Sequence, residues 1–344
     1  MTLPLRRGYA PMEAKLVAEL PLGDEWRYEP KWDGFRCLAF RDGDTVDLMS
    51  KAGKPLARYF PDLVATLLSL HAPRFVLDGE IVIPLAGTLS FDELLLRIHP
   101  AKSRVELLAR EHPASFIVFD LLVDARGRSL VDLPLDERRA ALEAFARRAI
   151  PKGSRVRLSP TTTAIAKVDG WMRSVGGGLD GVIAKRRDLP YRSGDRTGMQ
   201  KMKQLRTAEC VVGGFRYASK GTVVGSLLLG LYDDGGLLHH VGFTSNIPNA
   251  DKPAITKRLE KVIKAPGFTG QAPGGPSRWS TERSSEWQPL APKLVVEVEY
   301  DHFSGGRFRH GTSFLRWRPD KAPRQCTIAQ VEQEGRSALR LLTR

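Results

Sequence analysis

Glu29-Pro30-Lys31-Trp32-Asp33-Gly34-Phe35-Arg36 places one lysine beside an Asp-Gly turn and an arginine, directly before the alternating segment Cys37 to Arg41. A lysine amine attacks phosphorus or carbonyl carbon only when it is neutral, so a nucleophilic Lys31 requires surroundings that lower its pKa. Lowering that pKa from about 10.4 to near 7 costs roughly 4 to 5 kcal/mol. We expect bound metal and nearby cations in the pocket to supply this free energy. The alternative is a strand that enters a tight turn with Lys31 on a solvated face.

The composition limits the class of protein. A chain of 344 residues is long enough for two domains, and 42% hydrophobic residues is typical of a globular protein. The net charge is +14, with 33 basic and 26 acidic residues up to Lys203 and 20 basic and 13 acidic residues after it. Both parts are therefore expected to attract one nucleic acid, with a generally solubilising charge as the alternative.

The cysteines and the amino terminus indicate a protein of the reducing cytosol. Cys37, Cys210 and Cys326 are odd in number and lack Cys-x-x-Cys spacing, so we expect no disulfide framework and no structural zinc. The first residues meet charge before any apolar core of signal-peptide length, and no segment approaches a membrane span. Export and membrane insertion are therefore not expected.

Alternating segments and turn residues predict an α+β fold in two parts. An Asp-Gly pair between two apolar alternations predicts a hairpin directly after Lys31. In the first part we expect strands at 35–40, 45–49, 75–83 and 115–123, and helices at 59–70 and 133–148. In the second part we expect strands at 210–215, 226–232, 237–243, 294–300 and 313–317, with a helix near 254–263. Five short strands and one helix suit a small OB-type barrel.

Several charged residues stand inside these apolar segments. Asp78 and Glu80 would share one face of a strand unless Gly79 marks a bulge, and burying such a pair is costly without a cation or donor. We therefore favour a ligand or metal contact for this pair over turn chemistry alone. Lys201 and Lys203 would point to one side of an extended segment.

Five segments resemble, in order and spacing, the motifs of the covalent nucleotidyltransferases, which include DNA ligases, RNA ligases and mRNA capping enzymes. They are Lys31 to Arg36, Asp78-Gly79-Glu80, Phe116 to Leu122, Leu179 to Lys185 and Lys201-Met202-Lys203. Arg316-Trp317-Arg318-Pro319-Asp320-Lys321 resembles motif VI of ATP-dependent DNA ligases. Ser50 to Leu63 and Arg307 to Thr312 are similar to the small bacterial ligase C type. The resemblance covers nearly the whole chain.

The resemblance implies a role for each matching residue. Lys31 would carry AMP, Glu29 and Phe119 would hold adenine, and Asp180 and Glu80 would contact a divalent metal, magnesium or manganese. Arg36 and Glu80 would also contact ribose or the ends of the nick. The remaining nucleotide-binding residues would be Lys51, Lys185, Lys201 and Lys203, of which the last two would act on the α-phosphate. Arg318, Asp320 and Lys321 would belong to the catalytic machinery of motif VI.

Two positions depart from the family pattern. The acid of motif IV is usually glutamate and is Asp180 here, one methylene shorter, so direct metal ligation could become water-mediated. Lys51 stands where an arginine is common, and it offers a point charge in place of a bidentate fork. Neither departure removes a required charge.

The resemblance implies an adenylation (nucleotidyltransferase) domain at 1–204, built from antiparallel sheets with helices, and an OB-fold β-barrel domain at 205–344. It implies an enzyme that uses ATP to seal nicks in double-stranded DNA during repair, as a monomer with other repair proteins as possible partners. The alternatives are an RNA ligase or capping-type nucleotidyltransferase and a noncatalytic nucleic-acid-binding protein. AMP labelling of the protein, and its discharge by a nicked duplex, would separate them.

Overall fold

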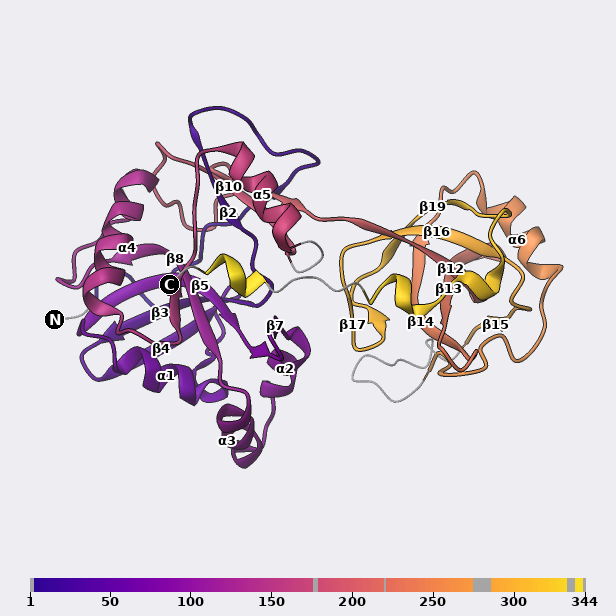
Figure 1. Ribbon diagram of the computed structural model, residues 1–344, viewed down its shortest axis with the longest axis horizontal. Coiled ribbons are helices and arrows are strands. Elements are labelled where there is room, and N and C mark those ends of the chain that lie inside the picture. The colour runs from indigo at the N-terminus through magenta and orange to yellow at the C-terminus, as the bar shows by residue number, and fades with distance from the viewer. Residues whose placement is uncertain (1–2, 176–178, 220, 275–285, 333–337, 343–344) are drawn as a thin grey trace. The chain divides into compact units, whose positions relative to one another are not determined.

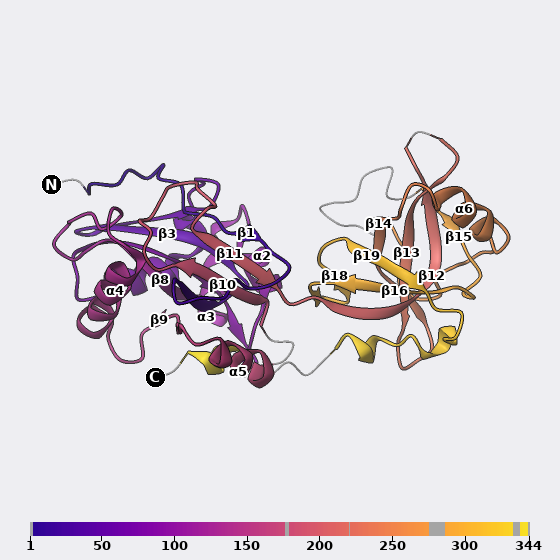
Figure 2. The ribbon, with the colours of Figure 1, turned by 90° about the horizontal axis from the view of Figure 1, so that it is seen from above.

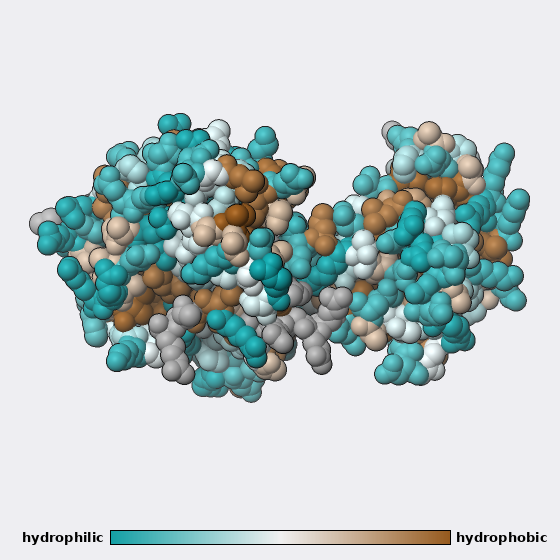
Figure 3. Space-filling model, turned by 45° about the horizontal axis from the view of Figure 1, so that its top comes forward, coloured by the Kyte–Doolittle hydropathy of each residue, from teal (hydrophilic) through white to brown (hydrophobic). Residues whose placement is uncertain are grey.

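The computed structural model describes residues 3–342 except 176–178, 220, 275–285 and 333–337. The chain forms two compact units. Unit 1 comprises Met1–Gln204 and Glu334–Arg344, and unit 2 comprises Leu205–Gln333. Figure 1 draws most of unit 1 in indigo to magenta and unit 2 in orange to yellow. On the face shown in Figure 3, most of the surface of each unit is hydrophilic.

Unit 1 contains a five-stranded sheet that carries much of its core. The strand order is β4 (Thr45–Ser50), β3 (Phe35–Asp42), β5 (Arg74–Val82), β8 (Ser115–Val123) and β9 (Val156–Leu158), and only the β8–β9 pair is parallel. Gly43 has φ of 63° between β3 and β4, which confirms the predicted Asp-Gly hairpin. The hairpin begins four residues after Lys31, so a rigid sheet holds the chain next to that lysine.

A second sheet of unit 1 brings the other motifs together. Its order is β1 (Lys15–Leu16), β11 (Met199–Lys203), β10 (Gly181–Arg186) and β2 (Trp26–Pro30). In this register Ile183 lies between Glu29 of β2 and Lys201 of β11, although these residues are far apart in the sequence. Two short strands, β6 (Pro84–Leu85) and β7 (Thr88–Leu89), form a separate hairpin.

Helices pack against these sheets. They are η1 (Ala57–Tyr59), α1 (Pro61–Leu68), α2 (Phe91–Arg97), α3 (Lys102–Glu111), α4 (Leu135–Ala149) and α5 (Ile165–Val175). Helix α2 begins after Ser90, whose Oγ accepts the backbone N–H of Glu93 at 3.3 Å. Proline occupies the first position of α1, where its missing N–H costs no helical hydrogen bond.

A buried ion pair joins α4 to β8. Arg138 donates from Nε and Nη2 to the carboxylate of Asp120 at 2.9 and 3.0 Å, and both side chains are almost completely buried. Arg138 also donates to the carbonyl of Leu133 at 2.6 Å. A guanidinium with this many acceptors is well satisfied, so the pair holds the helix in register on the strand.

Unit 2 is an OB-like barrel. Its sheet order is β13 (Val224–Tyr232), β14 (Leu238–Asn246), β19 (Thr312–Trp317), β16 (Val295–Tyr300), β12 (Arg206–Tyr217) and β15 (Gln288–Pro289), and β12 also pairs with β13, which closes the barrel. Helix α6 (Lys252–Glu260) lies against β13, and two short strands, β17 (Phe303–Ser304) and β18 (Arg307–Phe308), form a hairpin. The five predicted strands and the helix are confirmed.

The end of the chain corrects the prediction that the second domain extends from 205 to 344. The short helix η5 (Ala338–Leu341) contacts α5 and β7, which belong to unit 1. Ala338 and Leu342 are buried in one hydrophobic cluster with Trp26 and Trp171. The physical reason is local hydrophobicity, because Leu339 and Leu341 also pack against that cluster and leave water by doing so. In Figure 2 the end of the chain lies beside α5.

Among the described residues, no helix combines the length and the apolar character needed to cross a membrane.

Replacing Arg138 with leucine should destabilise unit 1 by about 3 to 5 kcal/mol, because Asp120 would remain buried without its partner. Urea unfolding followed by tryptophan fluorescence measures this change. Arg110→Leu is the matched control, because Arg110 is exposed on α3 and its loss should change stability by less than about 0.5 kcal/mol. Equal effects of the two substitutions would show that the Arg138–Asp120 pair contributes little.

Candidate active site

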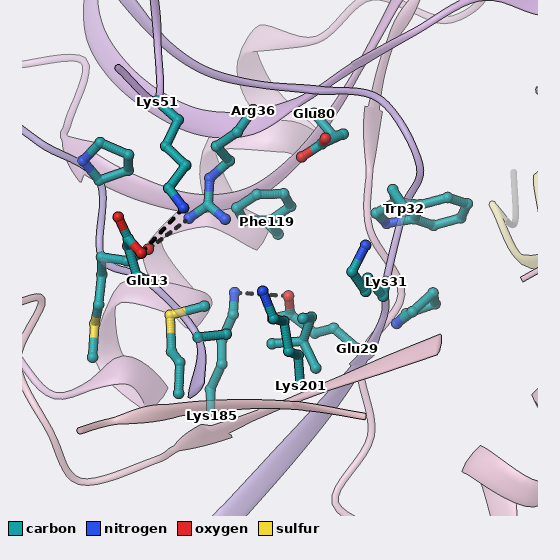
Figure 4. A pocket seen from close by; sticks show the side chains of 16 residues that line it. Glu13, Glu29, Lys31, Trp32, Arg36, Lys51, Glu80, Phe119, Lys185 and Lys201 are labelled. Atoms are coloured by element: carbon teal, nitrogen blue, oxygen red, sulfur yellow. Dashed lines mark hydrogen bonds and ion pairs between the residues drawn. The ribbon is translucent and has the colours of Figure 1, made fainter. Parts of the chain in front are cut away.

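A cavity of about 190 Å³ in unit 1 is lined by residues from both large sheets. The cavity brings together eight of the predicted site residues: Glu29, Lys31, Arg36, Lys51, Glu80, Phe119, Lys185 and Lys201 (Figure 4). These residues come from six segments that are separate in the sequence. The fold therefore assembles the motifs into one pocket.

Lys31 forms an ion pair with Asp180, the residue that precedes β10. The backbone N–H of Lys31 also donates to the carbonyl of Gly181 at 2.9 Å, which fixes the lysine beside this carboxylate. Burial by itself lowers the pKa of Lys31, but the charge and hydrogen bond of Asp180, followed by the charges of Glu80 and Asp33, raise it above its ordinary value of 10.5. The residues of the pocket by themselves therefore raise this pKa, because carboxylates surround the ammonium group, and the expected lowering by bound metal and nearby cations stays a prediction.

Glu29 and Lys185 form a second ion pair at the base of the cavity. Their side chains are 2.7 Å apart and only 2% and 5% exposed. Glu29 Oε1 is buried and has no hydrogen-bond partner among the described residues. A buried acceptor of this kind is costly to leave unpaired, so it suits a ligand that donates from an amino group.

Phe119 is a flat apolar surface with two cations beside it. The guanidinium carbon of Arg36 lies 4.4 Å from the ring centroid, and Nζ of Lys185 lies 4.6 Å from it. Arg36 lies beside this ring in Figure 4. A ring next to cations can stack with a purine and place positive charge beside a phosphate or ribose.

Asp78 has a different role from Glu80. Asp78 is fully buried and accepts two hydrogen bonds of 2.6 Å from Arg36 and one of 2.6 Å from the hydroxyl of Tyr191. The expectation of a ligand or metal contact is therefore wrong for Asp78, which instead orients Arg36. The register of β5 against β8 shifts between Asp78 and Gly79, but the extra residue is Phe119 of β8, and β5 pairs with β3 without interruption, so Gly79 does not mark a bulge in β5.

Glu80 lines the cavity, and burial raises its pKa to about 8, although the charges of Arg36 and Lys31 oppose this rise. The described residues contain no group of three or more His, Cys, Asp or Glu that could hold a metal ion. The charges of Glu80 and Asp180 nevertheless both raise the pKa of Lys31. Magnesium commonly binds through one or two carboxylates together with substrate phosphates, so this pair of carboxylates fits such an ion.

Cations complete the other side of the cavity. Burial lowers the pKa of Lys201, and the charges of Lys31, Lys51 and Lys203 lower it further. Lys51 contacts Glu13 at 3.1 Å and is 53% exposed. Lys203 follows two residues after Lys201 in β11 but does not line the cavity. A lysine whose pKa is lowered by neighbouring cations is poised to bind an anion, because the anion supplies the missing counter-charge.

Sequence reasoning missed two residues of the site. Trp32 lines the cavity, and its Nε1 donates to Ser159 Oγ at 2.9 Å. Glu13 also lines the cavity, where it binds Lys51. The position of Trp32 next to the lysine was a signal for its role. Glu13 lies in an ordinary lead-in segment, and no local pattern marks it.

The three motif VI residues lie in unit 2, in a network of ion pairs. Arg318 donates to Asp320 at 2.7 Å from Nη2 and to Glu209 from Nη1, and Lys321 contacts Glu209 at 2.7 Å. The hydrogen bond with Arg318 is the largest cause that lowers the pKa of Asp320 to about 2, and the charges of Arg318 and Arg316 add to it. Carboxylates of unit 2 therefore hold the motif VI cations in this conformation.

The site holds a lysine among carboxylates and cations in a two-sheet unit, and the next unit along the chain is an OB-like barrel. This combination defines the class of covalent nucleotidyltransferases. Comparison with known proteins identifies the family within this class. Residues 11–203 match the family model "ATP dependent DNA ligase domain", and residues 220–321 match "ATP dependent DNA ligase C terminal region".

Curated relatives match over almost their whole length. DNA ligase C2 of Mycolicibacterium smegmatis is 44% identical and covers 98% of each chain. DNA ligase C of Mycobacterium tuberculosis is 43% identical over 97% of this chain and 96% of the relative. Among solved structures, a Lig E DNA ligase shares the fold with a TM-score of 0.54 at 19% identity, over 90% of this chain and 99% of that chain. The chain belongs to the ATP-dependent DNA ligases, and within them to the bacterial ligase C type.

Asp180→Asn should shift the pH dependence of self-adenylation to lower pH, because Asp180 raises the pKa of Lys31. The amine must lose its proton to attack, so the rate rises with pH, and a lower lysine pKa moves that rise downward. The measurement is the rate of AMP-enzyme formation at low ATP concentration from about pH 6 to pH 9.5.

Asp180→Glu is the control for this shift, because it keeps the charge and restores the residue that is usual in the family. It should leave the rise near its wild-type position, whatever it does to the maximal rate. A rise that stays in place in Asp180→Asn would contradict the assigned role of Asp180.

Proposed function

We propose that the protein seals nicks with 5′-phosphate and 3′-hydroxyl ends in double-stranded DNA, using ATP and a magnesium or manganese ion through a lysyl-AMP intermediate on Lys31. The observation that carries the proposal is the position of Lys31, which lies in a cavity with an unpaired buried acceptor, an aromatic ring and several cations. The family to which the chain belongs supports DNA as the substrate.

The reaction consists of three phosphoryl transfers. Neutral Lys31 Nζ attacks the α-phosphorus of ATP, forms a P–N bond and releases pyrophosphate. The 5′-phosphate oxygen of the nick then attacks the same phosphorus, takes AMP and restores the lysine. The 3′-hydroxyl finally attacks the activated 5′-phosphate, so that the phosphodiester forms and AMP leaves. Each step requires charge compensation and an in-line nucleophile.

Residues of the cavity would hold the nucleotide for the first step. Glu29 Oε1 would accept from the exocyclic amine of adenine, and Phe119 would stack on the base. Lys201 would contact the α-phosphate from β11, with Lys203 as a second cation nearby. Arg36, held by Asp78, would face the ribose or the nick. These contacts orient the phosphorus toward Lys31.

The proton on Lys31 is the main obstacle to that step. Asp180 stabilises the ammonium form, so this contact must weaken before the amine can attack. Asp180 and Glu80 would hold a divalent metal, which would supply positive charge to the phosphates. In that arrangement the carboxylate of Asp180 would no longer stabilise the ammonium form of Lys31 as strongly, which would favour the neutral amine.

The charge and the cysteines support the remaining parts of the proposal. The net charge of +14 suits binding to a phosphate backbone, and Cys37, Cys210 and Cys326 are free and buried. We therefore place the protein in the bacterial cytoplasm, where it would act on nucleoid DNA as a monomer during repair, alone or with other repair proteins.

Lys31→Arg and Lys31→Ala should both abolish covalent AMP labelling by ATP. Arginine keeps the positive charge but offers no neutral amine near pH 7. The measurement is acid-labile AMP on the purified protein, followed by its discharge on a nicked DNA duplex. Lys54→Ala is the control, because Lys54 is exposed and does not line the cavity. Labelling that persists in either Lys31 variant would refute the proposed nucleophile, whereas labelled protein discharged only by RNA ends would refute the substrate.

Arg318→Ala should slow AMP-enzyme formation by orders of magnitude and slow closure of a preadenylated nick much less. In the ligase family, motif VI closes over the nucleotide for the first step, so its arginine matters mainly there. The ratio of the two single-turnover rates measures the effect. Arg316→Ala is the matched control, since Arg316 is 65% exposed and pairs with Glu297. Equal losses in both steps would mean that Arg318 has only a structural role.

A further inference from the structure

A second cavity of unit 1, about 840 Å³ in volume, lies at the open edge of the five-stranded sheet. Its walls are one side of α4 between Arg139 and Arg147, residues 150–154, β9 and the chain after β9, with one residue from α5. Figure 2 shows β9 next to α4. We call this cavity the α4–β9 groove. None of its lining residues lines the cavity that holds Lys31, so the nucleotide site does not account for it.

The charge of the groove is strongly one-sided. One carboxylate lines it, that of Glu143, and this carboxylate already accepts a hydrogen bond of 2.8 Å from Arg139. Five cations line the same groove: Arg139, Arg147, Lys152, Arg157 and Lys167. Such an excess of positive charge without counter-ions suits an anionic occupant.

Most of these cations are available to an occupant. Arg147, Lys152 and Lys167 are exposed, and in the described parts of the chain no carboxylate forms an ion pair with them. Arg139 is 5% exposed, and its Nη1 has no hydrogen-bond acceptor among the described residues. An unpaired buried N–H is costly, and an acceptor brought by an occupant would remove that cost.

The strand at the edge of the groove has one open side. Within the part of the chain that the structure describes, β9 pairs only with β8, where Arg155 O accepts from Phe116 N–H and Ser159 N–H donates to Val118 O, both at 2.9 Å. Backbone groups alternate along a strand, so the N–H and C=O of Leu158 point away from β8, toward the open edge. The N–H of Val156 also points outward and binds Ser154 Oγ at 3.1 Å.

The groove also has apolar walls. Ala146 and Ile150 from the end of α4 and Val156 and Leu158 from β9 line it between the cations. Phosphate backbones are recognised chiefly by exposed cations and other hydrogen-bond donors, which do not need an apolar wall. Added peptide strands use an open edge for their backbone and apolar pockets for alternate side chains.

We propose that the α4–β9 groove docks an acidic peptide segment of a partner protein, bound in extended form beside Leu158. Alternate side chains of the peptide point into the apolar wall, and the acidic residues between them pair with Arg147, Lys152 and Lys167. This role does not depend on the proposed ligase reaction. It gives the chain a means of recruitment that leaves the nucleotide cavity open.

One residue joins the groove to the nucleotide cavity. Ser159 lines the groove and accepts from Arg139 Nη2 through its carbonyl at 2.9 Å, while its Oγ accepts from Trp32 Nε1 at 2.9 Å. Trp32 follows Lys31 directly. Because Ser159 is hydrogen-bonded to both Arg139 and Trp32, a peptide that moves Arg139 changes the surroundings of Trp32, and binding should alter tryptophan fluorescence.

The test measures binding of a fluorescein-labelled hexapeptide of alternating aspartate and valine by fluorescence anisotropy, with the full chain. The double variant Arg147→Glu/Lys152→Glu should weaken binding by about tenfold or more, because repulsion replaces attraction at the rim. The matched control Arg104→Glu/Arg110→Glu makes the same charge change at exposed positions on α3 and should bind like the wild type. AMP labelling should be unchanged in both double variants.

A second probe tests the strand pairing without changing the protein. The same hexapeptide, N-methylated at alternate residues, cannot donate to the edge of β9 and should lose binding by a similar factor. Equal loss in the two double variants, or full binding of the methylated peptide, would overturn the proposal. No peptide binding, together with weaker nicked-duplex binding in Arg147→Glu/Lys152→Glu alone, would assign the groove to nucleic acid and overturn it too.

Discussion

The ion pair between Lys31 and Asp180 is the contact on which the rest of this site depends. It places the nucleophile, and at the same time it keeps the amine protonated, so the protein without its substrates is held in an inactive charge state. Each unit of raised pKa makes deprotonation about 1.4 kcal/mol harder. The site therefore requires new positive charge before Lys31 can attack, and ATP with a divalent metal is the form in which that charge would arrive. Coupling nucleophile activation to substrate binding in this way prevents a free amine from reacting in the empty pocket.

Carboxylates also hold other cations of the chain in place. Arg36 is held by Asp78, Lys185 by Glu29, and Lys51 by Glu13, so most cations of the cavity already have a carboxylate partner. In unit 2, Glu209 holds both Arg318 and Lys321. A phosphate that enters must compete with these carboxylates, which favours a highly charged ligand such as a triphosphate over a weakly charged one. Arg147, Lys152 and Lys167 of the α4–β9 groove have no such partner within the described residues, and this contrast with the nucleotide cavity is why we assign the groove a separate binding role.

In unit 1, carboxylates that hold the structure together differ from the carboxylate that lines the cavity in how deeply they are buried. Asp78 and Asp120 are buried and fully engaged by Arg36 and Arg138, and they hold strands and side chains in place. Glu80 lines the cavity with a pKa raised to about 8, so its charge responds to what enters. Two residues separated by one glycine in the same strand thus have different functions, because Arg36 and Tyr191 engage Asp78 whereas Glu80 lines the cavity.

The sequence by itself determined the elements and the chemistry of this protein. Alternation and the Asp-Gly turn predicted the hairpin after Lys31, five short strands predicted the barrel, and the order of the motifs predicted eight residues that meet in one cavity. The hairpin and the strands are local features, so neighbouring residues suffice to specify them, whereas the eight site residues followed from the resemblance to the nucleotidyltransferase motifs. Only the tertiary structure decided the direction of the Lys31 pKa, the structural role of Asp78, the return of Ala338–Leu342 to unit 1 and the existence of the α4–β9 groove. Each of these features depends on which distant residues the sheet register and the hydrophobic packing bring into contact. The direction of a pKa shift and the burial of a surface are set only when both partners are in place.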